Sequence, residues 1–175
     1  MLSRIGLLAC AYLLYSTATA ATVPDVELID QDGRPLHFYR DLVQGRVVAI
    51  DFVFTTCTTI CNLLGANFAQ AEKLIDPRLA SHVRLISISV DPVNDTPARL
   101  KEYSARFHGS PAWRLVTGKK SEVDTLLKAL GQYTADKTAH TGTVLIGNGD
   151  GQWVRANGLG AASTIADLLT RAARP

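Results

Sequence analysis

The sequence predicts an α/β sandwich built around a mixed β-sheet, and three observations lead to that prediction. Two continuous runs of β-branched and aromatic residues, at 47–54 and 83–90, are typical of strands buried on both faces of a sheet. Segments with apolar residues at helical spacing alternate with the strand-like runs. Late in the chain, two strand-like runs flank the glycine-rich turn at 147–151, which predicts a hairpin and an antiparallel part of the sheet.

An N-terminal hairpin is expected to open the domain. Residues 26–29 read as a strand, Gly33 supplies the positive φ of the turn that follows, and residues 36–38 read as the returning strand. After the strand at 47–54, apolar residues recur at helical spacing from Ile60 onwards, and Pro77 is expected to end that helix.

The second half of the chain continues the alternation. Asp91 and Pro92 end the strand at 83–90, and Thr96 followed by Pro97 is a helix cap with proline at the first helical position. The remaining elements are predicted as a strand at 113–116, a helix at 121–130, strands at 143–146 and 153–156, and a closing helix at 163–173.

The first twenty residues have the pattern of a secretory signal peptide. Arg4 precedes an apolar run from Ile5 to Tyr15, which is too short for a comfortable membrane span, and Ala18-Thr19-Ala20 is a small-residue cleavage signal. We therefore expect residues 1–20 to be a signal peptide and residues 21–175 to be one domain in an exported, periplasmic protein. Anchoring to the inner membrane would require an uncleaved or lipidated N-terminus, for which Cys10 offers a weak lipoprotein pattern.

Composition excludes some classes of function. The net charge is only +2, and no basic block or basic-aromatic interleaving occurs, so nucleic acid is not an expected partner. Met1 is the only methionine, which excludes a methionine-rich copper site in the domain. No repeats or low-complexity stretches are present, which is typical of an ordinary globular domain.

The most informative feature is a pair of cysteines, Cys57 and Cys61, at the turn between the 47–54 strand and the following helix. They are the only cysteines after Cys10. A strand, two cysteines and a helix form the thioredoxin redox motif, and helix N-termini lower thiol pKa values. The spacing here is one residue wider, which also suits two thiolates on one metal ion. Redox chemistry and soft-metal binding both remain open from the pair alone.

His140 is the candidate third ligand. It lies in a polar loop that enters a late strand, and in a thioredoxin-like sheet this loop lies beside the redox turn. Two thiolates and one imidazole suit Cu(I), and also Cu(II) if water or a carboxylate joins, whereas Zn²⁺ prefers four ligands. The other histidines are interpreted as structural or solvated: His37, His82 and His108.

Three segments resemble the Sco/SenC family of copper-binding assembly proteins: FVFTTCTTIC, SISVDPVNDTPARLKEY and AHTGTVLIGNGDG. The resemblance covers about residues 23–172, although Thr58 and Asn62 stand where the family often has proline. It implies a thioredoxin-like three-layer sandwich with a central mixed sheet, and copper bound by Cys57, Cys61 and His140.

The resemblance also implies a metallochaperone that delivers copper to the binuclear centre of cytochrome c oxidase subunit II, or that reduces its cysteines. Another periplasmic copper protein would be an alternative client, and a thiol reductant would keep the pair reduced. Asp91, at the end of a strand beside the site, is interpreted either as a strand terminator or as a carboxylate that tunes the metal through its ligands.

Three alternatives use the same cysteines. A thiol-disulfide oxidoreductase or redox sensor is one, although no proline lies between Pro111 and Pro175 to supply the cis-proline of thioredoxin-type enzymes. A peroxiredoxin-like peroxidase would need threonine where Phe54 stands. A binding module with an inert disulfide is the third. Enzymatic turnover of a small substrate is therefore not the favoured interpretation.

Overall fold

The computed structural model describes residues 23–150 and 152–174, so the predicted signal peptide and Cys10 lie outside the described residues. The element order is the one the sequence predicts: a hairpin, alternating strands and helices, a second hairpin and a closing helix. The strands are β1 (Glu27–Asp30), β2 (Pro35–His37), β3 (Val47–Val53), β4 (Val83–Ser89), β5 (Arg114–Thr117), β6 (Thr143–Gly147) and β7 (Val154–Asn157). The α-helices are α1 (Ile60–Leu74), α2 (Pro97–Ala105), α3 (Lys120–Ala129) and α4 (Ala162–Ala172).

The seven strands form one mixed sheet in the order β2-β1-β5-β4-β3-β6-β7. β3, β4 and β5 are parallel neighbours, whereas β6 pairs with β3 and β1 pairs with β5 in the antiparallel sense. All seven residues of β3 are buried, as its unbroken apolar run predicts for the centre of a sheet covered on both faces. The loop that leaves β3 is therefore held by a rigid strand.

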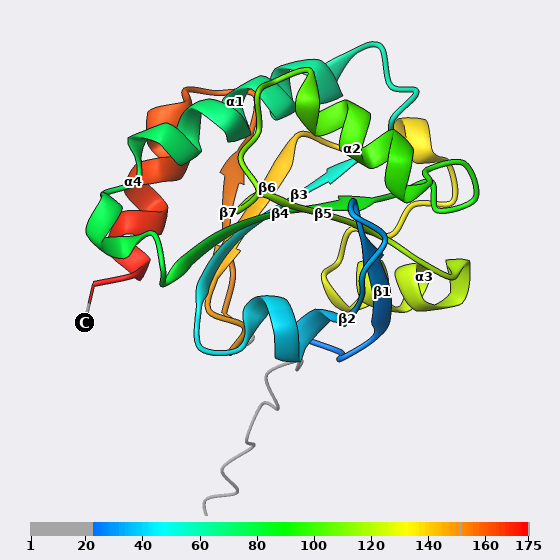
Figure 1. Ribbon diagram of the computed structural model, residues 1–175, viewed down its shortest axis with the longest axis horizontal. Helices are drawn as coiled ribbons and strands as arrows, with labels where there is room; N and C mark the ends of the chain where they lie inside the picture. The colour runs from blue at the N-terminus through cyan, green and yellow to red at the C-terminus, as the bar shows by residue number, and fades with distance from the viewer. Residues whose placement is uncertain (1–22, 151, 175) are drawn as a thin grey trace, which may run out of the picture.

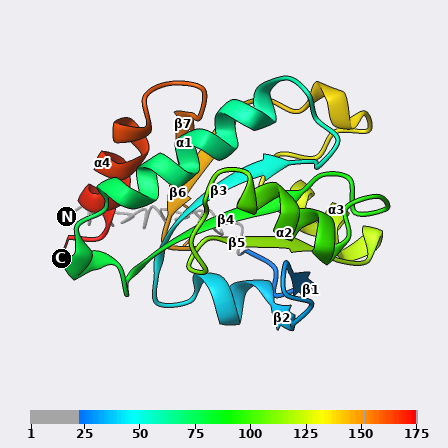
Figure 2. The same cartoon turned by 45° about the horizontal axis from the view of Figure 1, so that its top comes forward.

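Helices cover both faces of the sheet and make three layers (Figures 1 and 2). One core packs α1, α2 and α4 against one face, and the other packs α3 and the N-terminal segment against the opposite face. Trp113 is fully buried in the first of these cores. The predicted three-layer α/β sandwich with an N-terminal hairpin is confirmed.

Three short helices were not predicted: η1 (Phe38–Val43), η2 (Pro77–Leu79) and η3 (Lys137–Ala139). Phe38 was expected to end a strand, but it begins the π-helical turn η1. The Asp41 carboxylate accepts a hydrogen bond from the backbone N–H of His37 (2.7 Å), and the burial of Phe38, Leu42 and Val43 holds the turn on the core. Other boundaries differ from the predicted ones by about one residue. Within the described ranges, no helix has the length and apolar character that crossing a membrane would require.

Candidate metal centre

Cys57 lies in the loop between β3 and α1, at the carboxyl end of a central parallel strand. Its backbone N–H donates to the Phe54 carbonyl (3.1 Å), and its Sγ lies 3.6 Å from the hydroxyl of Thr59. α1 begins three residues later, at Ile60. The helix dipole and the hydroxyl therefore both act on a thiol that is carried by a loop.

Cys61 and His140, which are 79 residues apart in the chain, meet at this end of the sheet. The Sγ atom of Cys61 lies 3.5 Å from Nε2 of His140, and both side chains are buried. Cys61 belongs to the first turn of α1, and His140 follows η3 just before β6. Because β6 pairs directly with β3, the sheet brings the loops that carry the two residues together.

A backbone contact fixes the orientation of the His140 ring. Nδ1 lies 2.7 Å from the carbonyl oxygen of Lys137, which can only accept, so Nδ1 carries the proton and Nε2 presents its lone pair to Cys61. The ring also stacks edge-on against Phe54, with 5.3 Å between the centroids. Burial lowers the pKa of His140 despite the opposing effect of the Lys137 carbonyl, which keeps the imidazole neutral and available as a ligand.

Asp91 does not contact His140 directly but pairs with a residue that does. Its Oδ2 pairs with Nζ of Lys137 at 2.5 Å, and Lys137 is the residue whose carbonyl orients His140. Asp91 itself is 8% exposed. The structure thus connects Asp91 to the imidazole through Lys137, which is a positioning role and adds to its role at the end of β4.

The two thiols have opposite electrostatic environments. Burial raises the pKa of Cys61 far above its ordinary value, and its hydrogen bond with Cys57 adds to the increase. For Cys57, burial also acts to raise the pKa, but hydrogen bonds to Cys61 and Thr59 outweigh it, so the pKa is lowered. Cys57 is therefore the more readily ionised thiol, and Cys61 the protected one.

The three candidate ligands do not form a closed cage. Cys57, Cys61 and His140 are 6%, 0% and 8% exposed, although Thr56, Thr58 and Thr59 above them are open to solvent. Across residues 23–150 and 152–174, no three histidine, cysteine, aspartate or glutamate side chains are arranged to hold a metal ion as they stand. Cys61 and His140 thus form a fixed pair, and Cys57 is the donor that the loop can adjust.

The donor set nevertheless fits one class of metal. Both cysteines are free thiols, and the histidine is a neutral imidazole with an available Nε2. Two thiolates and one imidazole suit copper, whereas zinc would need a fourth ligand. The structure also contains no cis peptide bond among the described residues, so the cis-proline that marks thioredoxin-type oxidoreductases has no counterpart there.

The contacts of two aspartates near the site were not predicted from the sequence. Asp95 directly precedes Thr96, which caps α2 as predicted. The Asp95 carboxylate accepts hydrogen bonds from the Thr55 N–H (3.0 Å), the Thr55 hydroxyl (2.6 Å) and the Ser89 hydroxyl (2.6 Å). It thereby ties the start of the Cys57 loop to the end of β4.

Asp51 is fully buried in β3 and accepts from the hydroxyl of Ser87, while its Oδ2 has no partner. Burial raises the pKa of Asp51 to about 7, against the lowering effect of the Ser87 hydrogen bond. A single acidic residue inside an apolar strand was the available sequence signal, and it went unused.

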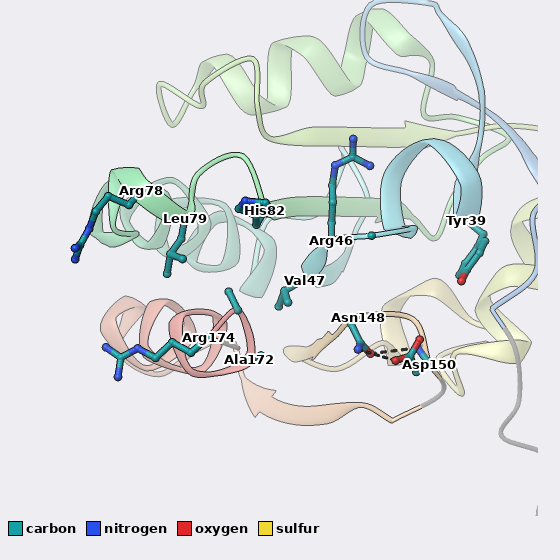
Figure 3. Close-up of a pocket in the computed structure, with 12 residues that line it drawn as sticks. Tyr39, Arg46, Val47, Arg78, Leu79, His82, Asn148, Asp150, Ala172 and Arg174 are labelled. Atoms are coloured by element: carbon teal, nitrogen blue, oxygen red, sulfur yellow. Dashed lines mark hydrogen bonds between the residues drawn. The ribbon is translucent and has the colours of Figure 1, made fainter.

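A wide groove lies elsewhere in the molecule. It has a volume of about 700 Å³, and its lining includes Arg46, His82 and Arg174 but no cysteine (Figure 3). It is located where β3 begins, at the opposite end of the sheet from Cys57. We place the chemistry at the cysteines despite the size of this groove, because reactive side chains define a site and hollow space alone does not.

The fold and site define a class of protein: a thioredoxin-like domain with a Cys-x3-Cys loop and a histidine directed at the second cysteine. The SCO1/SenC family model matches residues 15–172. The chain belongs to the SCO1/SenC family.

Similar proteins agree with this assignment. The SCO1 protein homolog of Bacillus subtilis is 36% identical over 97 residues, which are 54% of this chain and 49% of that protein. The chain thus matches about half the length of this curated relative. BsSco, described as a Sco-family cytochrome c oxidase assembly protein with a disulfide switch, has a TM-score of 0.70 at 28% identity, covering 87% of this chain and 93% of that one. Copper-bound ScoI of Bradyrhizobium japonicum has a TM-score of 0.65 at 26% identity, covering 84% and 96%.

Proposed function

We propose that this chain is a periplasmic copper metallochaperone that holds copper through Cys57, Cys61 and His140. The observation that carries the proposal is the 3.5 Å approach of His140 Nε2 to Cys61 Sγ, with a second thiol four positions earlier in the chain. The copper found in the similar ScoI structure supports the choice of metal. Copper is the cargo in this proposal, and the chain's own residues determine when it is held.

Each residue has a distinct task in this proposal. Cys61 and His140 are the buried, fixed donors, and His140 is kept in the required tautomer by the Lys137 carbonyl. Cys57 is the more readily ionised donor and lies on the loop nearest to solvent, so it is the donor through which copper enters and leaves. An acceptor thiol could approach across Thr56 and Thr58, which are both exposed.

The proposed client is the binuclear copper centre of cytochrome c oxidase subunit II. The support is the SCO1/SenC family membership and the description of BsSco as an oxidase assembly protein. Export of the chain through the signal peptide at 1–20 is part of the same proposal, because delivery to that centre takes place outside the cytoplasm.

The direct test is metal analysis of the reduced protein with copper and zinc in competition. One copper per chain and little zinc are expected. Cys57→Ser and Cys61→Ser should each lower Cu(I) affinity by more than the roughly 10–100-fold that the loss of outer partners causes. Full copper loading of a Cys57→Ser/Cys61→Ser protein would refute the site.

A second candidate function uses the same pair for thiol-disulfide exchange, and the opposite pKa shifts of the two thiols favour it. In that reaction the Cys57 thiolate attacks a client disulfide and forms a mixed disulfide, releasing one client thiolate. Cys61 then loses its proton and attacks Cys57, releasing the second client thiolate. The client gains two electrons, the pair becomes a Cys57–Cys61 disulfide, and an external thiol reductant restores it.

A deletion strain separates the two functions. Under copper limitation, loss of a metallochaperone should lower the copper content of the oxidase, and added copper should partly restore it. Loss of a thiol reductase should instead be rescued by an exogenous reductant. Normal oxidase assembly in the deletion strain would contradict this client for both functions.

A further inference from the structure

A hollow of about 440 Å³ opens beside the Cys57 loop and is lined by Thr55, Thr56, Arg99, Glu102 and Arg106. Thr56 is the residue directly before Cys57, so the hollow adjoins the donor that we propose exchanges copper. The candidate ligands themselves are more than nine-tenths buried. A partner that takes copper from these ligands must first dock on the surface around them. This hollow is part of that surface.

The hollow carries unbalanced positive charge. Arg99 and Arg106 are both exposed, and neither forms an ion pair within residues 23–150 and 152–174. Glu102 is the one acidic residue in the lining, and it is likewise outside the ion pairs of those ranges. Two guanidinium groups against one carboxylate leave the hollow suited to an anionic group.

Both arginines are held in place before any partner arrives. Nη1 of Arg99 donates to the carbonyl of Asn94 at 2.9 Å. The guanidinium of Arg106 lies 4.9 Å from the centre of the Tyr103 ring, in a cation–π contact. Because these contacts already restrict the two side chains, binding an anion there costs less conformational entropy than ordering free arginines would.

The walls of the hollow are connected to the site. The Tyr103 hydroxyl donates to the backbone carbonyl of Cys61, so the ring beneath Arg106 also touches the first turn of α1. On the other wall, Asp95 fixes Thr55 through its N–H and its hydroxyl. Arg106, Tyr103 and Thr55 therefore keep the hollow at a set position relative to the cysteines.

We propose that this arginine-lined hollow docks an acidic, extended segment of the copper-accepting protein, next to that protein's own thiols. Arg99 and Arg106 are seven residues apart, about 10 Å along a helical rise of 1.5 Å per residue. Carboxylates two or four residues apart on an extended chain lie on the same face, roughly 6.6 or 13 Å apart, so these spacings bracket that separation. The inference rests on the proposed delivery function and adds the chemistry by which the partner is recognised.

The test separates docking from copper binding. Two synthetic peptides carry Ser-x3-Ser in place of an acceptor's cysteines; one has aspartate and glutamate at the flanks, and the other has asparagine and glutamine. Their affinities for the reduced, copper-free chain are measured by calorimetry at low and high salt. We expect the acidic peptide to bind roughly 10-fold more tightly at low salt, and the difference to vanish at high salt.

Two double variants locate the effect. Arg99→Gln/Arg106→Gln should bind both peptides equally. Arg155→Gln/Arg171→Gln removes the same charge from exposed positions on β7 and α4 and should keep the preference. Equal binding of the two peptides to the unmodified chain would overturn the proposal, as would loss of the preference in the β7/α4 variant.

Copper transfer to the matching Cys-x3-Cys peptides completes the design. The arginine variant should load copper normally and transfer it roughly 10-fold more slowly to the acidic peptide at low salt. If the unmodified chain takes up no copper but still prefers the acidic peptide, the metallochaperone function fails and the docking surface stands. If it loads and transfers copper with no preference for acidic flanks, the docking surface fails alone.

Discussion

The two ends of the central sheet differ in what they offer a ligand. Where β3 ends, the Cys61–His140 pair lies in a packed region with little exposed surface, and Cys57 lies on the adjoining loop. Where β3 begins, a groove of about 700 Å³ has a mixed lining of charged, polar and apolar residues without a comparable pair (Figure 3). Small-molecule enzymes usually carry their reactive groups inside a concave pocket. Here the candidate ligands are buried outside any such pocket, and the 700 Å³ groove is at the opposite end of the sheet. This arrangement favours ligand exchange with a protein over turnover of a small substrate.

The largest effect expected at the cysteine end is the one caused by oxidation. A Cys57–Cys61 disulfide consumes both thiolates, so the oxidised chain should bind no copper, whereas the reduced chain binds one ion. Metal analysis of the two forms, with thiols titrated in parallel, checks this. Equal loading of both forms would mean that copper binds somewhere other than the cysteines, and the comparison between the two ends would lose its basis.

The second largest effect is expected from the buried Asp51, and it concerns the stability of the folded protein. Its pKa is raised to about 7, so the folded state binds this proton more tightly than the unfolded state, where the pKa is near 4. The stability of the wild-type protein should therefore fall as the pH rises through this window. Relative to wild type, Asp51→Asn should gain about 3 kcal/mol between pH 5 and pH 8.

Urea denaturation at the two pH values measures that difference. Asp124→Asn, at a more exposed position on α3, serves as the matched control and should show no comparable gain. The absolute stability of Asp51→Asn will also reflect an unpaired amide, so the change with pH is the informative quantity. A gain that does not depend on pH would show that Asp51 is not the titrating group.

Much of the cysteine end could be predicted from the sequence because its determinants are local. The apolar run before Cys57 and the helical spacing after Ile60 place the loop between β3 and α1. The late position of His140 places it in the loop that enters β6, a neighbour of β3. The contacts that orient these groups are not local. Asp95 reaches Thr55 across 40 residues, and the hydrogen-bonding partner of His140 is a backbone carbonyl that no sequence pattern identifies.

A smaller effect is expected from Asp91, which acts on His140 only through Lys137. Asp91→Asn removes the charge that holds Lys137 and should weaken Cu(II) binding about 10-fold, as is usual for outer partners of a ligand. Asp76→Asn breaks an arginine–aspartate pair with a 2.6 Å separation, to Arg78, which lines the groove at the opposite end of the sheet. This control variant should leave the Cu(II) affinity unchanged in the same competition assay. An equal loss of Cu(II) affinity in both variants would show that Asp91 does not position His140.

The smallest effect is expected at the groove end, and it tests whether the two ends differ at all. Exposed histidines bind Cu(II) adventitiously, so loss of copper binding in a histidine variant is meaningful only against a second histidine. His82 is exposed in the groove, whereas His140 is buried beside Cys61. His140→Ala should lower Cu(II) affinity, and His82→Ala should leave both the affinity and, within about 0.5 kcal/mol, the stability unchanged. If the two variants lost Cu(II) affinity equally, exposed imidazoles would bind copper as well as His140 does. The buried Cys61–His140 pair would then not be the specific copper site.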